Sequence, residues 1–413
     1  MMFKEMNKNV RLRRENVFSM MYLSGRYADT MKAITLPNID LILDDLTNDE
    51  YVQFVKLKEL RSNVIELKKE LKCMRLTIHT KKENEENVPQ AEKDAVLAFA
   101  GEVQRNAELL WDMEDKMMPF VLRLPNAMSP NVSSHDSLIV RSVPPKDNYQ
   151  FNALDYRKLA YTNQTMYRLI VGRNCDYFHG KGAKIYFAIK KHFAKLLRDK
   201  GFIDFSGLDF VKSAIIEASN DVSVRNYNDD SLTIHEGFKL RKGTQRVHLT
   251  GDASFESMAA FIVKLKQMQL PTRLFSIGCQ YDQSLQQLNT LHCVSVTESE
   301  HSMREMQSIL DTVWNAYVDL DVPCRLINCN QKSLNANEYL KYTVEVWFPS
   351  SRVWRTVARI SHYNNFVSRR LGLQDVHFID ATVADCRTLL ASIMENNQLF
   401  DGSFAQPKCI QQI

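Results

Sequence analysis

Two runs of heptad-spaced apolar residues constrain the fold of this 413-residue chain more than any other feature. In the first run, apolar side chains recur at alternating intervals of four and three residues: Leu60, Val64, Leu67, Leu71, Met74 and Ile78. In the second run they recur every seven residues, at Val96, Val103, Leu110, Met117 and Leu124. Such spacing places one apolar stripe on each helix, and a stripe of this kind needs a second helix to cover it.

A polar stretch, HTKKENEENVPQAEKD (79–94), separates the two runs and contains Pro89. Proline interrupts a helix, so the chain should turn there. The pattern therefore predicts an antiparallel two-helix coiled-coil hairpin within residues 36–125. Each arm of roughly thirty residues would be about 45 Å long.

Charge differs sharply between the two arms. Residues 51–82 hold nine basic and three acidic residues, whereas residues 83–118 hold three basic and ten acidic ones. One interpretation is ion pairing between the arms of an ordinary solvated coil. The other, compatible with the first, is that the basic arm binds a nucleic-acid phosphate backbone. The candidate contacts are Lys56, Lys58, Arg61, Lys68, Lys69, Lys72 and Arg75.

The remaining sequence predicts a linker followed by a mixed domain. Residues 126–150 are rich in proline, serine and asparagine, which is typical of a connection between domains. Within residues 151–413, a helical pattern at 183–202 is followed by strand-like runs at 291–297 and 342–348. No regular βαβ alternation and no GxGxxG loop occurs, so we expect an α+β domain built on an antiparallel sheet flanked by helices.

The N-terminal segment 1–35 is basic: residues 1–32 contain seven basic and three acidic residues. This composition predicts a leader for import into the mitochondrial matrix, with a basic N-terminal tail as the alternative. The eight cysteines form no CxxC pair and no metal-ligand series with histidine, which indicates reduced thiols and no metal site. No apolar run is long enough to predict a membrane-spanning helix.

Several motifs in fixed order resemble one known family. They are RLPNAMSPNV (123–132), CDYFHGKGAKIYFAI (175–189), LPTR (270–273) and CRTLLASIMENNQLFDG (386–402). In order and spacing they are similar to motifs of seryl-tRNA synthetases, which are class II aminoacyl-tRNA synthetases. The resemblance implies a class II domain preceded by a tRNA-binding arm, and it places Arg387 where the family binds the ATP γ-phosphate.

The resemblance also implies that most of the chemical groups of that family are replaced here. Tyr281 and Gln283 stand at the positions of the arginine and glutamate of the second motif, and Asp252 and Ser254 at those that read the serine amino group. Thr356 replaces a metal-binding glutamate, Arg359 replaces a pocket serine, and Glu345 matches a retained carboxylate. At the dimer motif, Gly207 and Leu208 stand in place of prolines. We expect Arg387 to pair with a carboxylate such as Glu345 or Asp385.

These replacements predict a non-catalytic paralogue of seryl-tRNA synthetase, without a cofactor, that acts as a heterodimer subunit with the active mitochondrial enzyme. One alternative is a mitochondrial RNA- or DNA-binding protein that uses the basic arm. A second alternative is a divergent active synthetase, for which histidines near the equivalent cleft would be the acid–base candidates: His179, His248, His292 and His362.

Overall fold

The computed structural model describes two units of the chain, divided between Leu124 and Pro125. The described residues are 48–83, 89–121, 125–145, 153–164, 166–168, 176–219, 247–265, 268–281, 287–371, 373 and 376–411. The expected leader, residues 1–35, lies outside these ranges. Each unit is considered separately below.

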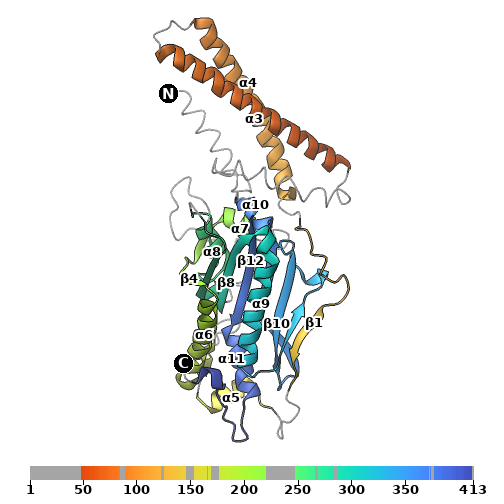
Figure 1. Cartoon of the computed structure of the whole chain (residues 1–413), viewed down its shortest axis with the longest axis vertical. Coiled ribbons are helices and arrows are strands. Elements are labelled where there is room, and N and C mark those ends of the chain that lie inside the picture. Colours follow the sequence, from red (N-terminus) through yellow and green to blue (C-terminus); the bar gives the residue numbers. More distant parts are fainter. Residues whose placement is uncertain are drawn as a thin grey trace. The chain divides into compact units, whose positions relative to one another are not determined.

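The first unit is a helical hairpin made of α3 (Asn48–Glu83) and α4 (Gln90–Val121) (Figure 1). The Lys81 ammonium lies 2.9 Å from the Glu92 carboxylate, so the end of α3 lies beside the start of α4 and the helices run antiparallel. Heptad positions fill the contact: Val64 is 1% exposed, and Leu71, Val103 and Leu110 are buried with it. The predicted hairpin is confirmed.

The second unit contains an eight-stranded sheet in the order β1-β9-β10-β11-β12-β8-β7-β4. All neighbours are antiparallel except β4 and β7, which are parallel. The strands are β1 (Leu138–Val143), β4 (Ile203–Asp204), β7 (Thr272–Tyr281), β8 (Gln287–Glu298), β9 (Cys324–Asn328), β10 (Leu340–Phe348), β11 (Val353–Asn364) and β12 (Val376–Asp385). The expected antiparallel α+β architecture is confirmed.

Helices and two small sheets surround this large sheet. The helices are α5 (Tyr156–Thr162), α6 (Gly180–Asp199), α7 (Ser213–Ser219), α8 (Phe255–Ile262), α9 (Ser302–Asp319), α10 (Phe366–Leu371) and α11 (Cys386–Asn396). Short 3₁₀ turns are η3 (Ser299–His301), η4 (Gln331–Ser333) and η5 (Lys408–Ile410). The two-stranded sheets pair β2 (Met166–Arg168) with β3 (Asp176–Phe178) and β5 (Phe210–Lys212) with β6 (Val247–Leu249).

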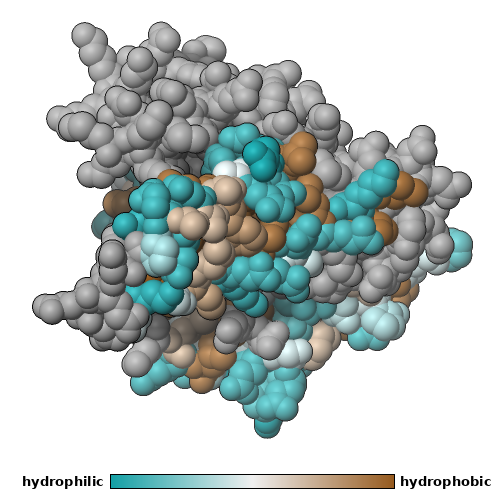
Figure 2. Space-filling model, turned by 90° about the horizontal axis from the view of Figure 1, so that it is seen from above, coloured by the Kyte–Doolittle hydropathy of each residue, from teal (hydrophilic) through white to brown (hydrophobic). Residues whose placement is uncertain are grey.

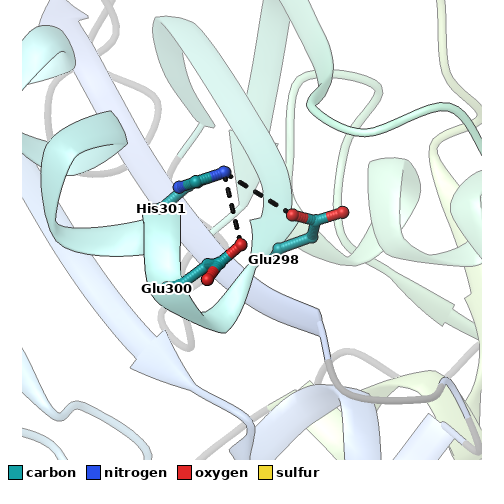
Figure 3. A group of neighbouring side chains, drawn as sticks. All are labelled: Glu298, Glu300 and His301. Atoms are coloured by element: carbon teal, nitrogen blue, oxygen red, sulfur yellow. Dashed lines mark ion pairs between the residues drawn. The ribbon is translucent and has the colours of Figure 1, made fainter.

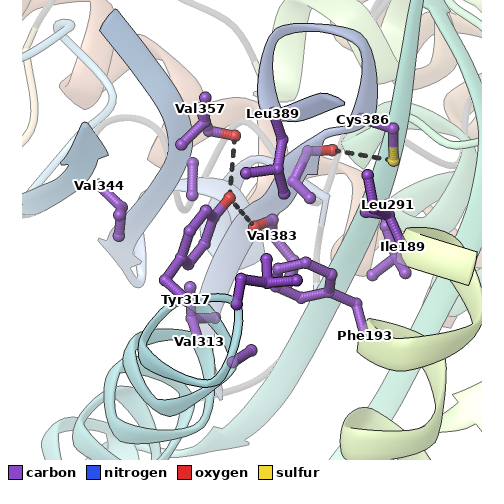
Figure 4. Packing of buried hydrophobic residues seen from close by; sticks show 14 of the residues in the cluster. Ile189, Phe193, Leu291, Val313, Tyr317, Val344, Val357, Val383, Cys386 and Leu389 are labelled. Carbon is purple, nitrogen blue, oxygen red and sulfur yellow. Dashed lines mark hydrogen bonds between the residues drawn. The ribbon is translucent and has the colours of Figure 1, made fainter. Parts of the chain in front are cut away.

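Side-chain alternation along the strands gives the sheet two apolar faces. One face packs against α6, α9 and α11 in the larger core, where Phe193 and Tyr317 are almost fully buried. The Tyr317 hydroxyl donates to the Val383 carbonyl at 2.9 Å, which satisfies its polar atom inside this core (Figure 4). The other face packs against α7, α8 and α10 in a smaller core.

The segment 126–150, expected to be a linker, is partly integrated into the second unit. Its residues Leu138–Val143 form β1, which pairs with β9 at the edge of the large sheet. The Asn126 side-chain amide is buried and donates to the carbonyls of Asn337 and Tyr363 at 3.0 and 2.8 Å. The described part of this segment therefore consists of a strand and of a preceding stretch that Asn126 holds against the second unit.

Candidate functional site

Arg387 begins α11 and is held there by its neighbours. The Asp385 carboxylate caps the helix by accepting the backbone N–H groups of Arg387 and Thr388 at 3.1 and 3.4 Å. When the Asn289 amide is oriented with its oxygen toward α11, the guanidinium donates to it from Nε and Nη2, each at 3.2 Å. Asp385 thus binds the backbone of Arg387, and the side chain contacts an amide of β8.

Glu345, the retained carboxylate, has a different cation as its partner. Arg325 on the neighbouring strand β9 donates to Glu345 Oε2 from Nε at 2.7 Å and from Nη2 at 2.6 Å. The Arg325 guanidinium also lies 4.7 Å from the centre of the Trp354 ring. Both nitrogens reach the same carboxylate oxygen, so Arg325 is a partner of Glu345, and the expected pairing of Glu345 with Arg387 stays a prediction.

Arg359 lies above a buried carboxylate on the adjacent strand. Its Nη2 atom is 3.9 Å from Asp380 Oδ2, and the Arg359 side chain is 39% exposed whereas that of Asp380 is 0% exposed. Asp380 Oδ2 also accepts the Tyr363 hydroxyl at 2.9 Å, and Oδ1 lies 2.6 Å from His292 Nε2. Burial opposes ionisation of Asp380, but His292, Arg359 and Tyr363 together lower its pKa below the ordinary value.

The other ring nitrogen of His292 contacts Gln280. The Gln280 amide nitrogen donates to the Ala253 carbonyl at 2.6 Å, and this contact fixes which end of the amide faces His292. The same nitrogen lies 2.8 Å from His292 Nδ1, so Nδ1 accepts a hydrogen bond. His292 Nε2 thus faces Asp380 Oδ1 at 2.6 Å, and the Arg359 guanidinium supplies a positive charge on the other side of this buried carboxylate.

The replaced positions Asp252 and Ser254 have structural partners. Asp252 Oδ1 accepts the backbone N–H of Cys279 at 2.7 Å, and a side chain at Gly278 would overlap this carboxylate. Ser254 is buried at the start of α8, where its hydroxyl accepts the Ser257 N–H at 3.2 Å. Asp252 thus holds the segment before α8 against β7, and Ser254 caps α8.

Two further replaced positions lie on strands. Tyr281 ends β7 in register with Gln287, and burial raises the pKa of its phenol above the ordinary value. Thr356 is exposed on β11, and Glu345 is its register partner on the neighbouring strand β10. Gln283 lies outside the described residues.

The structure brings only some of the predicted residues together. Gln280 on β7 connects the segment before α8 to His292 on β8. His292 contacts Asp380 on β12, and Asp380 contacts Arg359 on β11, so the contacts cross four neighbouring strands. Sequence reasoning missed Asp380 and Tyr363. A lone acidic residue inside the apolar strand VHFIDATVAD was the available signal for Asp380, since a buried carboxylate needs partners.

The predicted interface positions lie beside exposed apolar side chains. A side chain at Gly207 would overlap Ser257 Oγ, which accepts the Leu208 N–H at 3.0 Å, so glycine allows this close approach. Leu208 is 76% exposed and Ile203, on the edge strand β4, is 64% exposed. We call the exposed apolar residues of this region the β4 surface: Ile203, Leu208, Phe210 and Phe261. Apolar side chains also reach the surface between hydrophilic ones in the view of Figure 2.

The basic arm of the hairpin presents its charges to solvent. The exposed members of the predicted set are Lys56, Lys68, Lys69, Lys72 and Arg75. The side chains of Lys58 and Arg61 lie outside the described part of the chain. No helix within the described ranges is long and apolar enough to cross a membrane.

One group of potential metal ligands occurs among the described residues, made of Glu298, Glu300 and His301 (Figure 3). All three side chains are exposed, and His301 Nε2 lies 3.6 Å from each carboxylate. Ion pairing at the surface accounts for this arrangement without a metal.

Comparisons with known proteins agree with this fold. The seryl-tRNA synthetase of Pyrococcus horikoshii, solved as a complex with ATP, superposes with a TM-score of 0.71 over 98% of this chain and 97% of that one, at 14% identity. The chain therefore has the fold of the class II aminoacyl-tRNA synthetases. No protein-family model matches it.

Within this class, the sequence is similar to seryl-tRNA synthetases and to a synthetase-like relative. The serine–tRNA synthetase-like protein Slimp of Drosophila melanogaster is 24% identical over 348 residues, which cover 76% of this chain and 72% of that protein. The mitochondrial serine–tRNA ligase of Mus musculus is 23% identical over 398 residues, which cover 86% of this chain and 75% of that protein. The resemblance to the seryl-tRNA synthetase family is confirmed.

Proposed function

We propose that this chain is a non-catalytic paralogue of seryl-tRNA synthetase that acts by association in the mitochondrial matrix. Its partner would be the active mitochondrial seryl-tRNA synthetase, with which it would form a heterodimer. Two relatives, one named as synthetase-like and one as a mitochondrial ligase, support the class and the compartment. The proposal has two parts: a loss of adenylation and a surface for association.

The loss of adenylation is supported by the engagement of the remaining charged groups. Activation of an amino acid by ATP requires cations at the phosphates, and catalytic groups of this kind act because they are already aimed at the developing charge. Glu345 is bound by Arg325, and Arg359 balances the buried Asp380. Thr356, in the position of a metal-binding glutamate, has no carboxylate to offer. These groups stabilise the sheet instead of presenting a nucleotide site.

The β4 surface carries the proposal of association. Exposed apolar side chains that gather on one surface mark interaction sites. Leu208 and Ile203 are the most exposed of the four, and β4 comes last in the order of the described sheet, an edge position to which a strand of a partner can add. Burial of about 100 Å² of apolar area on each such side chain stabilises a complex by roughly 2.5 kcal/mol before the entropic cost of association.

The test is co-expression of the full chain with the mitochondrial seryl-tRNA synthetase of the same organism, followed by native mass spectrometry. Leu208→Asp should abolish the heterodimer, because it places a charge in an apolar contact. Leu138→Asp is the matched control, since Leu138 is an exposed leucine, 55% accessible, on the opposite edge strand β1. Recovery of only symmetric homodimers, or equal loss in both variants, would contradict the proposal.

A second function is supported by the exposed cations of α3. Lys68, Lys69 and Lys72 lie within one and a half turns of helix and are all exposed, as a phosphate-binding stripe requires. If the hairpin binds tRNA or other mitochondrial RNA or DNA, reversing these three charges to glutamate should weaken binding and flatten its salt dependence. Reversal of three exposed lysines of the other unit is the charge-matched control: Lys191, Lys195 and Lys200. Equal effects of the two triple variants would exclude a specific role for the hairpin.

A further inference from the structure

The strand β1 leaves one edge of the large sheet open. It is the first strand in the sheet order and pairs on one side with β9 (Figure 1). Within the part of the chain that the structure describes, β1 pairs with no other strand, and the backbone of Leu138–Val143 makes no hydrogen bond outside the ladder with β9. Since alternate N–H and C=O groups of an edge strand point outward, β1 presents donors and acceptors at the spacing that another strand matches.

Three consecutive aliphatic side chains of β1 are exposed to solvent. Leu138 is 55% exposed, Ile139 58% and Val140 51%. Leu138 and Ile139 point to opposite faces of the sheet, because successive side chains of a strand alternate. Ile139 is in register with Ile327 of β9, which is itself buried. A strand added to this edge would therefore meet an aliphatic side chain on each face of the sheet.

The charges in β1 and directly before it limit the chemistry of such a strand. Arg141 donates from Nη2 to Asp311 Oδ1 at 2.7 Å, and Gln307 Nε2 donates to the same oxygen at 3.1 Å. The charge of Arg141 is thus balanced by α9. Asp136, two residues before β1, is exposed, and its carboxylate disfavours an acidic segment nearby. The edge therefore suits a segment that is aliphatic and uncharged or weakly basic.

Area and shape distinguish a peptide from a second copy of this chain. Full burial of an aliphatic side chain removes roughly 100 Å² from water, so completing the burial of three half-exposed ones removes only about 150 Å². A stable contact between two folded proteins buries roughly 800 Å² on each partner. The ladder with β9 also shifts register between Ile139 and Arg141, and such a bulge bends and twists an edge against a second rigid sheet. A short flexible segment can follow the bend and needs less area, because its backbone supplies the hydrogen bonds.

We propose that β1 binds an extended peptide segment of a partner protein, which adds to the large sheet beside β1. The peptide backbone pairs with the outer edge of Leu138–Val143, and its aliphatic side chains contact Leu138 on one face and Ile139 on the other. Strand addition of this kind draws affinity from main-chain hydrogen bonds and selectivity from alternate side chains. Because β1 and β4 stand at opposite ends of the sheet order, peptide binding does not require the proposed heterodimer.

The experiment measures fluorescence anisotropy of the labelled peptide KSVTITVS with the purified full chain. A control peptide carries methyl groups on its four central amide nitrogens, which keeps every side chain but removes those hydrogen-bond donors. The loss of two or three backbone hydrogen bonds should weaken binding roughly 30-fold or more. Both peptides meet the same wild-type chain, so this comparison does not depend on the folding of a variant.

Two variants of the chain test whether the peptide binds at β1. Ile139→Lys puts a charge where an aliphatic contact is expected and should weaken peptide binding at least about tenfold. Val353→Lys is the matched control, because Val353 is 41% exposed but begins β11, an interior strand of the sheet. On addition of the peptide, hydrogen exchange should slow within residues 137–144 of the wild-type chain and stay unchanged in the Ile139→Lys variant.

Three results of these measurements would overturn the proposal: equal affinities of the two peptides, equal peptide binding by the two lysine variants, or no binding at about 100 μM chain. The oligomeric state of the chain distinguishes the other occupant. A wild-type homodimer that is lost in Ile139→Lys but persists in Leu208→Asp would show that a second copy occupies the edge, and it would overturn the proposal as well.

Discussion

Replacement of Arg359 by alanine tests the charge balance beneath the sheet surface. The substitution removes the guanidinium beside the buried Asp380 carboxylate, which keeps the Tyr363 hydroxyl at 2.9 Å and His292 Nε2 at 2.6 Å as neighbours. For two unit charges 3.9 Å apart, Coulomb's law at an effective dielectric constant of about 20 gives an attraction of about 4 kcal/mol. Because Arg359 is 39% exposed, water screens part of this, and we expect a loss of about 2–4 kcal/mol in the free energy of unfolding.

The assay is urea unfolding of the full chain followed by tryptophan fluorescence. Three tryptophans report on the second unit: Trp314, Trp347 and Trp354. Arg359→Lys is the matched control, since it retains the charge and should lose less stability. A double-mutant cycle with Asp380→Asn should give a coupling free energy of about 2 kcal/mol or more between positions 359 and 380.

The pH dependence of the free energy of unfolding also tests whether Arg359 acts as the counterion of Asp380. The pKa of Asp380 is lowered in the folded chain, so its contribution to stability is present above the pKa of the unfolded chain and is lost as pH falls. The penalty of Arg359→Ala should therefore shrink as the carboxyl group becomes protonated in acid. A penalty below about 0.5 kcal/mol at neutral pH, or strict additivity with Asp380→Asn, would refute the proposed role of Arg359 as counterion.

Three other predictions concern packing and charge. Burial opposes ionisation of Glu305, but hydrogen bonds from Arg273 at 2.6 Å outweigh this effect and lower the pKa of Glu305. The wild-type chain should therefore gain stability as pH rises through the acid range, and Arg273→Met should reduce this gain. Urea midpoints at several pH values measure it. Gly278→Ala forces a methyl group onto the Asp252 carboxylate and should cost about 1–3 kcal/mol in urea unfolding, an effect that disappears if the segment before α8 can move. Val64→Ala should destabilise the hairpin by about 2 kcal/mol, seen as reduced helical circular dichroism on heating, and an unchanged melting curve would exclude a tightly packed seam.

Local patterns predicted the hairpin well. Val64 and Leu71 lie one heptad apart, and they are buried by contacts with α4, the next helix along the chain. Their spacing was therefore enough to predict a helical partner. The strand-like run 342–348 was also predicted, and it lies in β10 (Leu340–Phe348), whose burial alternates from Val344 to Phe348.

Local sequence patterns could not predict contacts between segments that are far apart in the chain. The strand β1 pairs with β9, nearly two hundred residues later, and its sequence LIVRSV has three exposed apolar residues in succession rather than an alternating pattern. The environment of Asp380 is similarly non-local, because His292, Arg359 and Tyr363 come from two neighbouring strands whose register only the folded sheet defines. The resemblance to the family predicted which positions are replaced, but not the partners that the residues at those positions have in the folded chain.

We propose that this chain does not activate an amino acid. The decisive measurement is an ATP–pyrophosphate exchange assay of the purified full chain with each standard amino acid, with and without tRNA. We expect no isotope exchange above the protein-free background for serine or any other amino acid. Exchange that depends on one amino acid and disappears in Arg387→Ala would contradict it, because that result would place a working nucleotide site at the start of α11.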